Sequence, residues 1–447
     1  MEPIASSNNV PESSSSRSVR AKRRRVFIAS ALVGFLAIGA LAVILTGGES
    51  KSERGGYVTG DPIIWTAITA SSNTNLRCGL MNSGKIWCWG SNDVGQLGNG
   101  GSPDAAWHFV HPDIQGSAKA ITAGGGHACA LLDTNEITCW GSNDSGAVGN
   151  GSSDNQLLPA KVNGISSATS LASGDKHTCA LLSDSTISCW GYNGNGQLGN
   201  GSNADSSTPV QVSAITNATK IDVGADHSCA LLADSTIWCW GANGNGQLGN
   251  GSNIDSNTPV QVSGITTATS VGTGGNHTCA LLSTKAAWCW GFGLNGALGN
   301  GANNDSSTPV KVTGGTNALS VGVGNDHACI TVDTTASIPD DNKVKCWGNN
   351  DVGQLGIGTN ALGATVNKNS AVISIFPAQP NPTTDPPNGA VADDKQSAFI
   401  SGSLTCTPMT AASVTAGKPL CWGLVNPGFP NYTFSPWPYK VIDPFTN

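Results

Sequence analysis

Charge is scarce in this sequence, because Asp, Glu, Lys and Arg make up only 11% of its 447 residues. A long helical or coiled-coil protein needs many charged side chains along its exposed faces, so this scarcity argues against that class. Methionine is also rare, at three residues, whereas glycine is abundant, at 58. Glycine permits tight turns, and the composition therefore favours an all-β protein of short strands joined by many turns.

Basic residues are particularly few beyond position 55. Residues 1–55 hold eight Lys or Arg and four Asp or Glu, which leaves 14 basic and 25 acidic residues in the remainder, a net charge of −11. A domain with that charge is repelled by the phosphates of nucleic acids. We therefore expect no nucleic-acid partner for the main domain.

No cysteine stands alone. The 14 cysteines form seven local pairs: Cys78/Cys88, Cys129/Cys139, Cys179/Cys189, Cys229/Cys239, Cys279/Cys289, Cys329/Cys346 and Cys406/Cys421. Metal binding is the alternative to disulfides for paired cysteines, but zinc ligands are typically two to four residues apart and none of these pairs is that close. Regular pairs in an even number predict a disulfide framework and hence an oxidising compartment.

Only one hydrophobic run is long enough to span a membrane. Val26–Leu45 contains 20 residues without a charge, which corresponds to about 30 Å of helix. Six basic residues between Arg17 and Arg25 precede it, and such an excess holds the N-terminus in the cytoplasm. A cleaved signal peptide, cut near Ala40 to Ala42, is the alternative.

These features predict a single-pass membrane protein with four segments. They are a basic cytoplasmic tail at 1–25, a transmembrane signal anchor at 26–46, a flexible stalk at 47–62 and an extracellular or periplasmic domain at 63–447.

A unit of about 50 residues recurs through that domain. The tripeptide Cys-Trp-Gly occurs seven times, at Cys88, Cys139, Cys189, Cys239, Cys289, Cys346 and Cys421. Each unit contains four short strand patterns separated by turn-forming Gly and Asn, which predicts a seven-bladed β-propeller of four-stranded blades. The last interval is the longest, and we assign its excess to an insertion around 360–395. The segment Pro436–Ile442 resembles the last strand of a unit, and one hypothesis is that it joins the first blade and locks the ring.

The repeated motifs resemble a known family. The third unit contains Gly174-Asp-Lys-His177, Trp190-Gly-Tyr-Asn193, Gly196-Gln-Leu-Gly199 and Pro209-Val-Gln-Val212. With these motifs, the chain is identified as a member of the regulator-of-chromosome-condensation repeat family from about Ile63 to the C-terminus. The resemblance implies a seven-bladed propeller, and the paired cysteines resemble the bacterial branch of the family.

The resemblance also implies protein binding. The eukaryotic founder of the family exchanges guanine nucleotide on a small nuclear GTPase and binds chromatin, whereas a secreted bacterial member inhibits a β-lactamase through loops on one propeller face. Nucleotide exchange is disfavoured here because the domain is predicted to be exported and is acidic, and because the regular spacing leaves no room for the founder's wedge-like insertion. We therefore expect a scaffold or inhibitor-like module that binds a protein, with cell-wall or carbohydrate binding as the alternative.

One loop position varies within a constant frame. Five units carry a histidine at the same place, at His127, His177, His227, His277 and His327, and the two residues before it differ from unit to unit. Variation on a fixed frame is typical of binding loops, although neutral drift produces it too. The candidate partner-binding residues are Asp175, Lys176, Asp226, Asn276, Asn325 and Asp326. The histidines themselves are either a metal-binding ring or, more simply, hydrogen-bond donors to neighbouring loops.

Trp107 and His108 interrupt the repeat in the first inter-blade loop, and they are further candidates because aromatic residues are favoured at interfaces. No nucleophile elbow or zinc-protease motif is present, and Gly194-Asn-Gly196-Gln-Leu-Gly199 lacks the βαβ context of a dinucleotide site. We therefore expect no enzymatic activity, no cofactor and no bound metal.

Overall fold

The computed structural model describes residues 65–71, 74, 76–101, 110–332, 344–351, 353–357 and 366–373, and the backbone of four strands between 399 and 440. The chain divides into two compact units, Met1–Thr59 and Gly60–Asn447, and every described residue belongs to the second. The predicted tail, anchor and stalk therefore lie outside the described residues. In the described part, no helix is long and apolar enough to cross a membrane.

Antiparallel strands make up nearly all the regular secondary structure of the described residues. The first sheet has three strands: β1 (Trp65–Ala70), β2 (Arg77–Met81) and β3 (Ile86–Trp89). Six further sheets have four strands each: β4 (Ala118–Ala123), β5 (His127–Leu132), β6 (Ile137–Gly141) and β7 (Gln156–Lys161); β8 (Ala168–Ser173), β9 (His177–Leu182), β10 (Ile187–Gly191) and β11 (Ser206–Gln211); β12 (Ala218–Val223), β13 (His227–Leu232), β14 (Ile237–Gly241) and β15 (Ser256–Gln261); β16 (Ala268–Thr273), β17 (His277–Leu282), β18 (Ala287–Gly291) and β19 (Ser306–Lys311); β20 (Ala318–Val323), β21 (His327–Val332), β22 (Val344–Gly348) and β23 (Lys368–Ile373); β24 (Phe399–Ser401), β25 (Leu404–Thr407), β26 (Leu420–Gly423) and β27 (Ser435–Lys440). A short 3₁₀ turn, η2 (Leu294–Gly296), follows β18.

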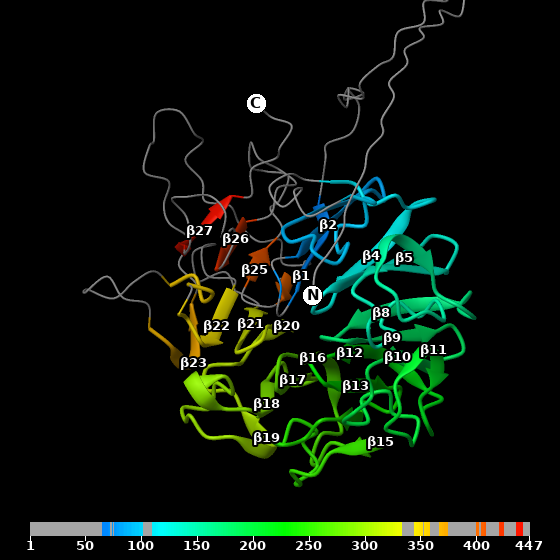
Figure 1. The fold of residues 1–447 in the computed structure, drawn as a ribbon. Helices are drawn as coiled ribbons and strands as arrows, with labels where there is room; N and C mark the ends of the chain where they lie inside the picture. Colours follow the sequence, from blue (N-terminus) through cyan, green and yellow to red (C-terminus); the bar gives the residue numbers. More distant parts are fainter. Residues whose placement is uncertain are drawn as a thin grey trace, which may run out of the picture. The chain divides into compact units, whose positions relative to one another are not determined.

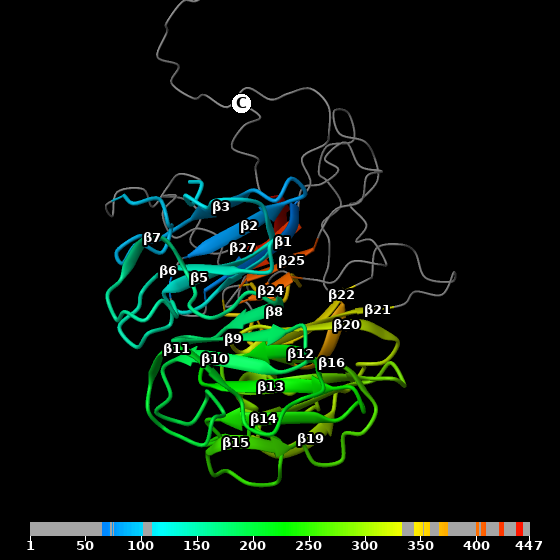
Figure 2. The same ribbon diagram turned by 90° about the vertical axis from the view of Figure 1, so that its right-hand side faces the viewer.

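Within residues 60–447 the sheets follow one another around a common centre (Figures 1 and 2). The innermost strands contact one another in the order β1, β4, β8, β12, β16, β20 and β24, and β24 contacts β1 again. This is the arrangement of a β-propeller, as the repeat predicts, and six of its sheets are complete four-stranded blades. Beside β3 in the first sheet, Val110 pairs with Cys88 as an isolated bridge.

In each of the four sheets from β4 to β19, the two central strands form a tight hairpin with a disulfide across it. In β9 and β10, Cys179 stands opposite Cys189, and their Cα atoms are 4.1 Å apart. The turn between them is closed by Asp184, whose Oδ1 accepts the Thr186 N–H at 3.0 Å. Six of the predicted disulfides are formed among the described residues. Cys406 and Cys421 face each other in register across β25 and β26, but their side chains lie outside the described residues.

The hydrophobic core lies between adjacent sheets. Ile187 and Val212 from one sheet pack in a single cluster with Ile221 and Trp240 from the next. Trp240 is fully buried, and its Nε1–H donates to the carbonyl oxygen of Gln197 in the preceding sheet at 2.9 Å. The Trp of each described Cys-Trp-Gly unit from the second to the sixth makes the corresponding bond. Each blade therefore depends on its neighbours for both apolar burial and a buried hydrogen bond.

In the C-terminal part, the predicted insertion begins too early, and the hypothesis of a strand shared with the first blade is wrong. Lys368–Ile373, inside the predicted insertion around 360–395, forms the outer strand β23. It pairs with β22 in the register used by the other outer strands, because the free edge of β22 needs backbone partners even where the Pro-Val-x-Val motif is missing. The C-terminal strand β27 pairs with β26 in its own sheet rather than with the first sheet. The ring therefore closes through the β1–β24 contact, without a strand shared between the two ends.

Candidate partner-binding face

The loops that join strands one to two and strands three to four of each sheet emerge at the same edge, because neighbouring strands are antiparallel. We call the surface that they form the loop face. In the third sheet the two loops are joined directly, since the Tyr192 N–H donates to the carbonyl of Lys176 at 2.9 Å. The candidate residues Asp175, Lys176, Asp226, Asn276, Asn325 and Asp326 all lie in loops of this face.

Buried histidines fasten the first of these loops to the next blade. The Nε2 atom of His177 lies 3.0 Å from Ser228 Oγ in the following sheet, and Ser228 Oγ in turn donates to the carbonyl of Gln197 at 3.0 Å. Because the single hydroxyl proton goes to that carbonyl, Nε2 of His177 must carry a hydrogen and donate it. His127 and His227 make the same relay through Thr178 and Thr278. At these three histidines the partner is a strand residue of the neighbouring blade rather than the predicted loop.

Burial keeps these imidazoles neutral. Desolvation lowers the pKa of His127 and His277 to about 4, and the pKa of His177, His227 and His327 to about 3. Nearby histidines contribute to the lowering at His177, His227 and His327. Within the described ranges, no group of His, Cys, Asp or Glu side chains is arranged to hold a metal ion. The histidine side chains are packed between adjacent blades, and those of His127, His177 and His227 make hydrogen bonds across the interface.

The relay is broken at one position. Ala328 occupies the place that Thr178, Ser228 and Thr278 fill in other sheets, so the buried ring of His277 has no side-chain hydroxyl to bond, and only the backbone of Asn325 interacts with it as a hydrogen-bond partner. A buried donor with a poor partner is costly. This interface should therefore be weaker than the three with an intact relay.

The Gly-x-x-His motif requires glycine because there is no room for a Cβ atom at its first position. A Cβ atom on Gly174 would lie 2.3 Å from the carbonyl oxygen of Gly224 in the next sheet and 2.6 Å from the ring of His177. Gly124 and Gly224 are equally confined. The motif thus allows the loops of adjacent blades to approach backbone to backbone.

We expect Gly174→Ala to destabilise the propeller by about 1–3 kcal/mol, the usual cost of overpacking a filled interior. Gly244→Ala is the matched control, because a Cβ atom there meets nothing within 4 Å and Gly244 does not have a positive φ. Urea unfolding of the two variants measures the difference. Equal stabilities would show that the loops can separate without cost.

The first residues of the five variable pairs form an open ring of hydrogen bonds around part of the centre. The N–H groups of Gly125, Asp175, Ala225 and Gly275 donate to the carbonyls of Asp175, Ala225, Gly275 and Asn325, at 3.0, 3.1, 3.3 and 3.2 Å respectively. Asp175, Ala225 and Asn325 also line a small cavity of about 50 Å³ inside this ring. The backbone of the ring is constant, and only its side chains vary.

The second residues of the pairs stand outside the ring. Lys176 and Asn276 are exposed, and Asp226 and Asp326 are half-buried. Their carbonyls accept N–H groups from the second loop of the same sheet, as described for Lys176, so their backbone is also fixed. All six candidates with described side chains are thus brought together around the centre of one face. Trp107 and His108 lie outside the described residues.

Three of the candidate residues on the loop face, Asp175, Asp226 and Asp326, are acidic. Burial raises the pKa of Asp226, and the nearby carboxylates of Asp175 and Asp255 raise it further while Lys176 opposes them. Burial likewise raises the pKa of Asp326, with a further contribution from Asp351. Like charges gathered in partly buried positions favour a cationic ligand.

A buried asparagine holds the second loop in five of the described sheets, whereas Gly293 takes its place in the sheet β16–β19. Asn193 accepts the Leu198 N–H at 2.9 Å and donates to the carbonyls of Ser202 and Ala204. Asp205 accepts the Asn193 N–H at 2.7 Å. The Asp in this Asn- and Ser-rich loop is therefore committed to turn formation.

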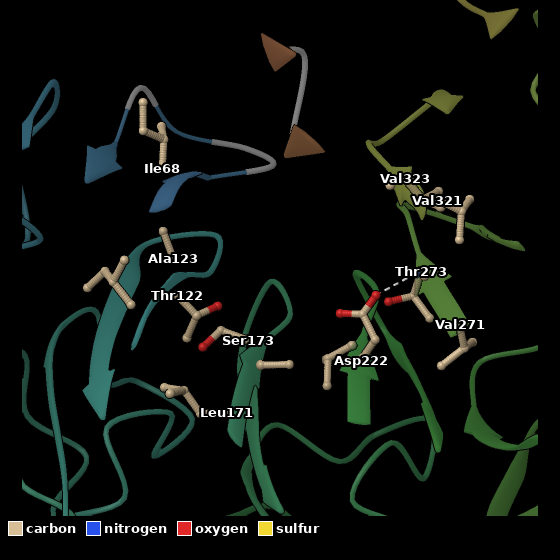
Figure 3. A pocket seen from close by; sticks show the side chains of 15 residues that line it. Ile68, Thr122, Ala123, Leu171, Ser173, Asp222, Val271, Thr273, Val321 and Val323 are labelled. Carbon is tan, nitrogen blue, oxygen red and sulfur yellow. Dashed lines mark hydrogen bonds between the residues drawn. The ribbon is translucent and has the colours of Figure 1, made fainter. Parts of the chain in front are cut away.

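Asp222, which we did not predict as a functional residue, is the one charged side chain among the described residues lining a cavity of about 300 Å³ between the inner strands. Figure 3 shows its carboxylate among Thr122, Ser173 and Thr273. Comparison of the repeats could have found it, because the equivalent residues are Thr122, Ala172, Gly272 and Gly322, each opposite the first cysteine of its unit.

Comparison with known proteins agrees with this geometry. Residues 51–330, more than half of the chain, match the RCC1-like domain family. The chain belongs to that family. Among curated proteins, human E3 ubiquitin-protein ligase HERC2 is 30% identical over 97 residues, which cover 20% of this chain and 2% of HERC2. The chain therefore corresponds to a small fraction of that relative.

Solved structures with the RCC1-like fold superpose on most of the chain. Human WBSCR16 gives a TM-score of 0.66 at 16% identity, covering 80% of this chain and 94% of WBSCR16. Prp20p from Saccharomyces cerevisiae gives 0.57 at 18% identity, covering 69% of this chain and 76% of Prp20p. Identities this low establish the propeller fold alone. The RCC1-like match confirms the family resemblance read from the repeated motifs.

Proposed function

We propose that this RCC1-like chain is a membrane-anchored, extracytoplasmic propeller of seven blades that binds a protein partner with its loop face. The seventh blade in this count is the three-stranded first sheet. The anchor is the uncharged run 26–46 behind its basic flank, and six buried disulfides support an oxidising compartment outside the cytoplasm.

The observation that carries the proposal is the variable pairs on a constant frame. Hydrogen bonds fix the backbone of Asp175, Ala225, Gly275 and Asn325 in one ring, while the side chains change from blade to blade. A rigid scaffold with varied side chains lowers the entropy lost on binding and allows specific recognition. Ile254, 77% exposed, and Leu294, 53% exposed, add apolar contact points in the second loops of two adjacent sheets.

The charge of the loop face indicates which class of protein segment it can bind. Asp175, Asp226 and Asp326 surround the centre with Lys176 as the neighbouring cation, so a basic protein segment is the complementary ligand. One structural relative also has protein partners, because Prp20p has binding properties to Gsp1p and histones. A scaffold or inhibitor-like role follows from such binding.

The test is crosslinking of the tagged full-length protein on intact cells, followed by pull-down. Wild type is compared with a loop-face variant, Asp175→Asn/Asp226→Asn/Asp326→Asn, and with Asp133→Asn/Asp184→Asn/Asp234→Asn as the matched control. The control residues lie in the hairpin turns at the opposite edge of the sheets and remove the same charge. We expect a protein partner whose recovery falls at least tenfold in the loop-face variant and is unchanged in the control.

Other outcomes distinguish the alternatives. Retention of the wild type on cell-wall material, with no protein captured, supports the carbohydrate-binding alternative. Specific capture of a small GTPase would favour nucleotide exchange. Equal loss in both variants would indicate non-specific electrostatic binding and would contradict the proposed face.

A further inference from the structure

The cavity between the inner strands combines apolar walls with one carboxylate. Leu171, Val271 and Val321 line it, together with Asp222 and the hydroxyl-bearing Ser173 and Thr273. Figure 3 shows these side chains around the same hollow. The buried Ser173 hydroxyl has no hydrogen-bond partner, and the buried Thr273 hydroxyl faces the Asp222 carboxylate. A cavity with mostly apolar walls and a few polar groups is typical of sites that bind small ligands.

The hydrogen bond that Asp222 makes to the next blade does not explain why this residue is a carboxylate. Its Oδ2 accepts the Thr273 N–H from the next blade at 2.8 Å. Thr69 occupies the equivalent position in the first sheet, opposite Cys78, and its neutral hydroxyl accepts the Ala123 N–H in the same way at 3.1 Å. A neutral acceptor therefore satisfies this inter-blade bond. An ionised carboxylate in a buried place is costly unless a cation pairs with it.

We propose that the cavity binds a primary alkylammonium group, with Asp222 as its counter-ion and the apolar residues Leu171, Val271 and Val321 around its alkyl chain. The ammonium presents three N–H donors, and Asp222, Ser173 and Thr273 provide three acceptors. The binding does not depend on the protein partner proposed above.

Other cations fit the site less well. A metal ion needs four or more ligands, and the described part of the cavity offers one carboxylate. A guanidinium pairs best with both oxygens of a carboxylate, but Oδ2 of Asp222 already accepts the Thr273 N–H, and the carboxylate takes a further hydrogen bond from the Val223 backbone. A compact ammonium does not need both oxygens, because one remaining lone pair accepts one of its N–H groups.

The group could come from a free amine or from a lysine side chain. Asp222 is two residues before Gly224 of the loop face, or about 7 Å along the strand. A lysine of a bound protein that entered through the ring at Asp175, Ala225 and Asn325 is therefore within reach of Asp222.

The test is calorimetric titration of the full-length protein in detergent with butylammonium chloride at pH 7.5, with butan-1-ol as the uncharged analogue. Asp222→Asn keeps an oxygen for the Thr273 N–H but removes the charge. We expect it to weaken butylammonium binding about 30-fold or more, as the loss of a buried charge pair does. Asp234→Asn, in the hairpin turn at the opposite edge of the same sheet, removes the same charge outside the cavity and should bind like wild type. Thermal melting of each variant establishes that it is folded.

The pH dependence is a second measurement of the same pair. Burial raises the pKa of Asp222 to about 6, while hydrogen bonds from Thr273 and Val223 act in the opposite direction. A carboxylate that titrates there is mostly ionised at pH 7.5, so binding should weaken about fourfold at pH 5.5 in wild type and stay constant in Asp222→Asn. Equal affinities of the two proteins for butylammonium, or equal affinities of wild type for butylammonium and butan-1-ol, would overturn the proposal.

The source of the ammonium is decided by competition. An end-blocked Gly-Lys-Gly peptide that displaces butylammonium supports a lysine side chain as the ligand, and its norleucine analogue is the control. Binding of butylammonium without displacement by the peptide supports a free amine. Both results retain the ammonium site.

Discussion

Lowering the pH from 7 to 4 is expected to unfold the propeller in one steep transition. Five buried histidines have pKa values of about 3 to 4 in the folded protein, against about 6.5 in the unfolded chain. Between these values the unfolded chain binds protons that the folded chain does not, so stability falls as pH falls through this window. Above about pH 6.5 both states are neutral and the histidines add no pH dependence.

The size of the effect follows from the number of protons. Each proton taken up on unfolding changes the free energy of unfolding by about 1.4 kcal/mol per pH unit. Five histidines therefore contribute up to about 7 kcal/mol per unit near pH 5. Asp222 opposes them with about one proton between pH 4 and 6, because its folded-state pKa is raised rather than lowered. The net decrease in the free energy of unfolding is large enough to remove a typical stability of about 5–15 kcal/mol within a few pH units.

Tryptophan fluorescence and circular dichroism as a function of pH measure the transition. His177→Gln keeps a side-chain donor toward Ser228 but cannot be protonated, so it should reduce the steepness by about one proton. The exposed His111→Gln is the control and should leave the curve unchanged. A stability that is flat between pH 6.5 and 4.5 would contradict the burial of neutral imidazoles.

Removal of one disulfide is the second large effect. Cys179→Ala/Cys189→Ala should lower the free energy of unfolding by about 2–3 kcal/mol, because the bridge closes a loop of 10 residues and so restricts the unfolded chain. Cys329→Ala/Cys346→Ala opens a loop of 17 residues and should cost about 0.5 kcal/mol more by the same argument. Denaturant unfolding under oxidising conditions measures both.

Reduction of all the bridges should prevent refolding. Six bridges at about 2–3 kcal/mol each exceed the whole stability of a typical domain. The native protein, in contrast, should resist reductant, because the described cysteines are fully buried. Refolding of the reduced chain from urea, with and without an oxidant, tests this. Recovery of the native spectrum in reductant would show that inter-blade packing suffices without the bridges.

The sequence predicted the blade but not the way that blades join. Cysteine spacing, Gly-Asn turns and strand-length apolar runs are local signals, and they specify the hairpin that pairs Cys179 with Cys189. The relay from His177 through Ser228 to Gln197 connects residues of two units, and nothing in one unit indicates it. For the same reason, the sequence shows Asp222 only as an unusual polar residue in an inner strand. The cavity that it faces is formed by inner strands of several units, so it is evident only in the folded protein.

The errors at the C-terminal end have the same origin. Lys368–Ile373 has no Pro-Val-x-Val motif, yet it forms β23 because the exposed edge of β22 must be paired. The resemblance of Pro436–Ile442 to an outer strand was correctly recognised, but which sheet receives that strand depends on the position of β26. Edge pairing is settled by what is near in space, and local pattern does not encode it.

By itself, the sequence determined the class of fold, the repeat, the cysteine pairs and the variable residues of the loops, because each depends on contacts within one unit of about 50 residues. Only the tertiary structure decided that Asp175, Asp226 and Asp326 gather on one acidic face, that the histidines are buried and neutral, and that Asp222 faces a shared cavity. Those properties arise between blades, where burial and electrostatic interaction depend on distances that the spacing along the chain does not fix.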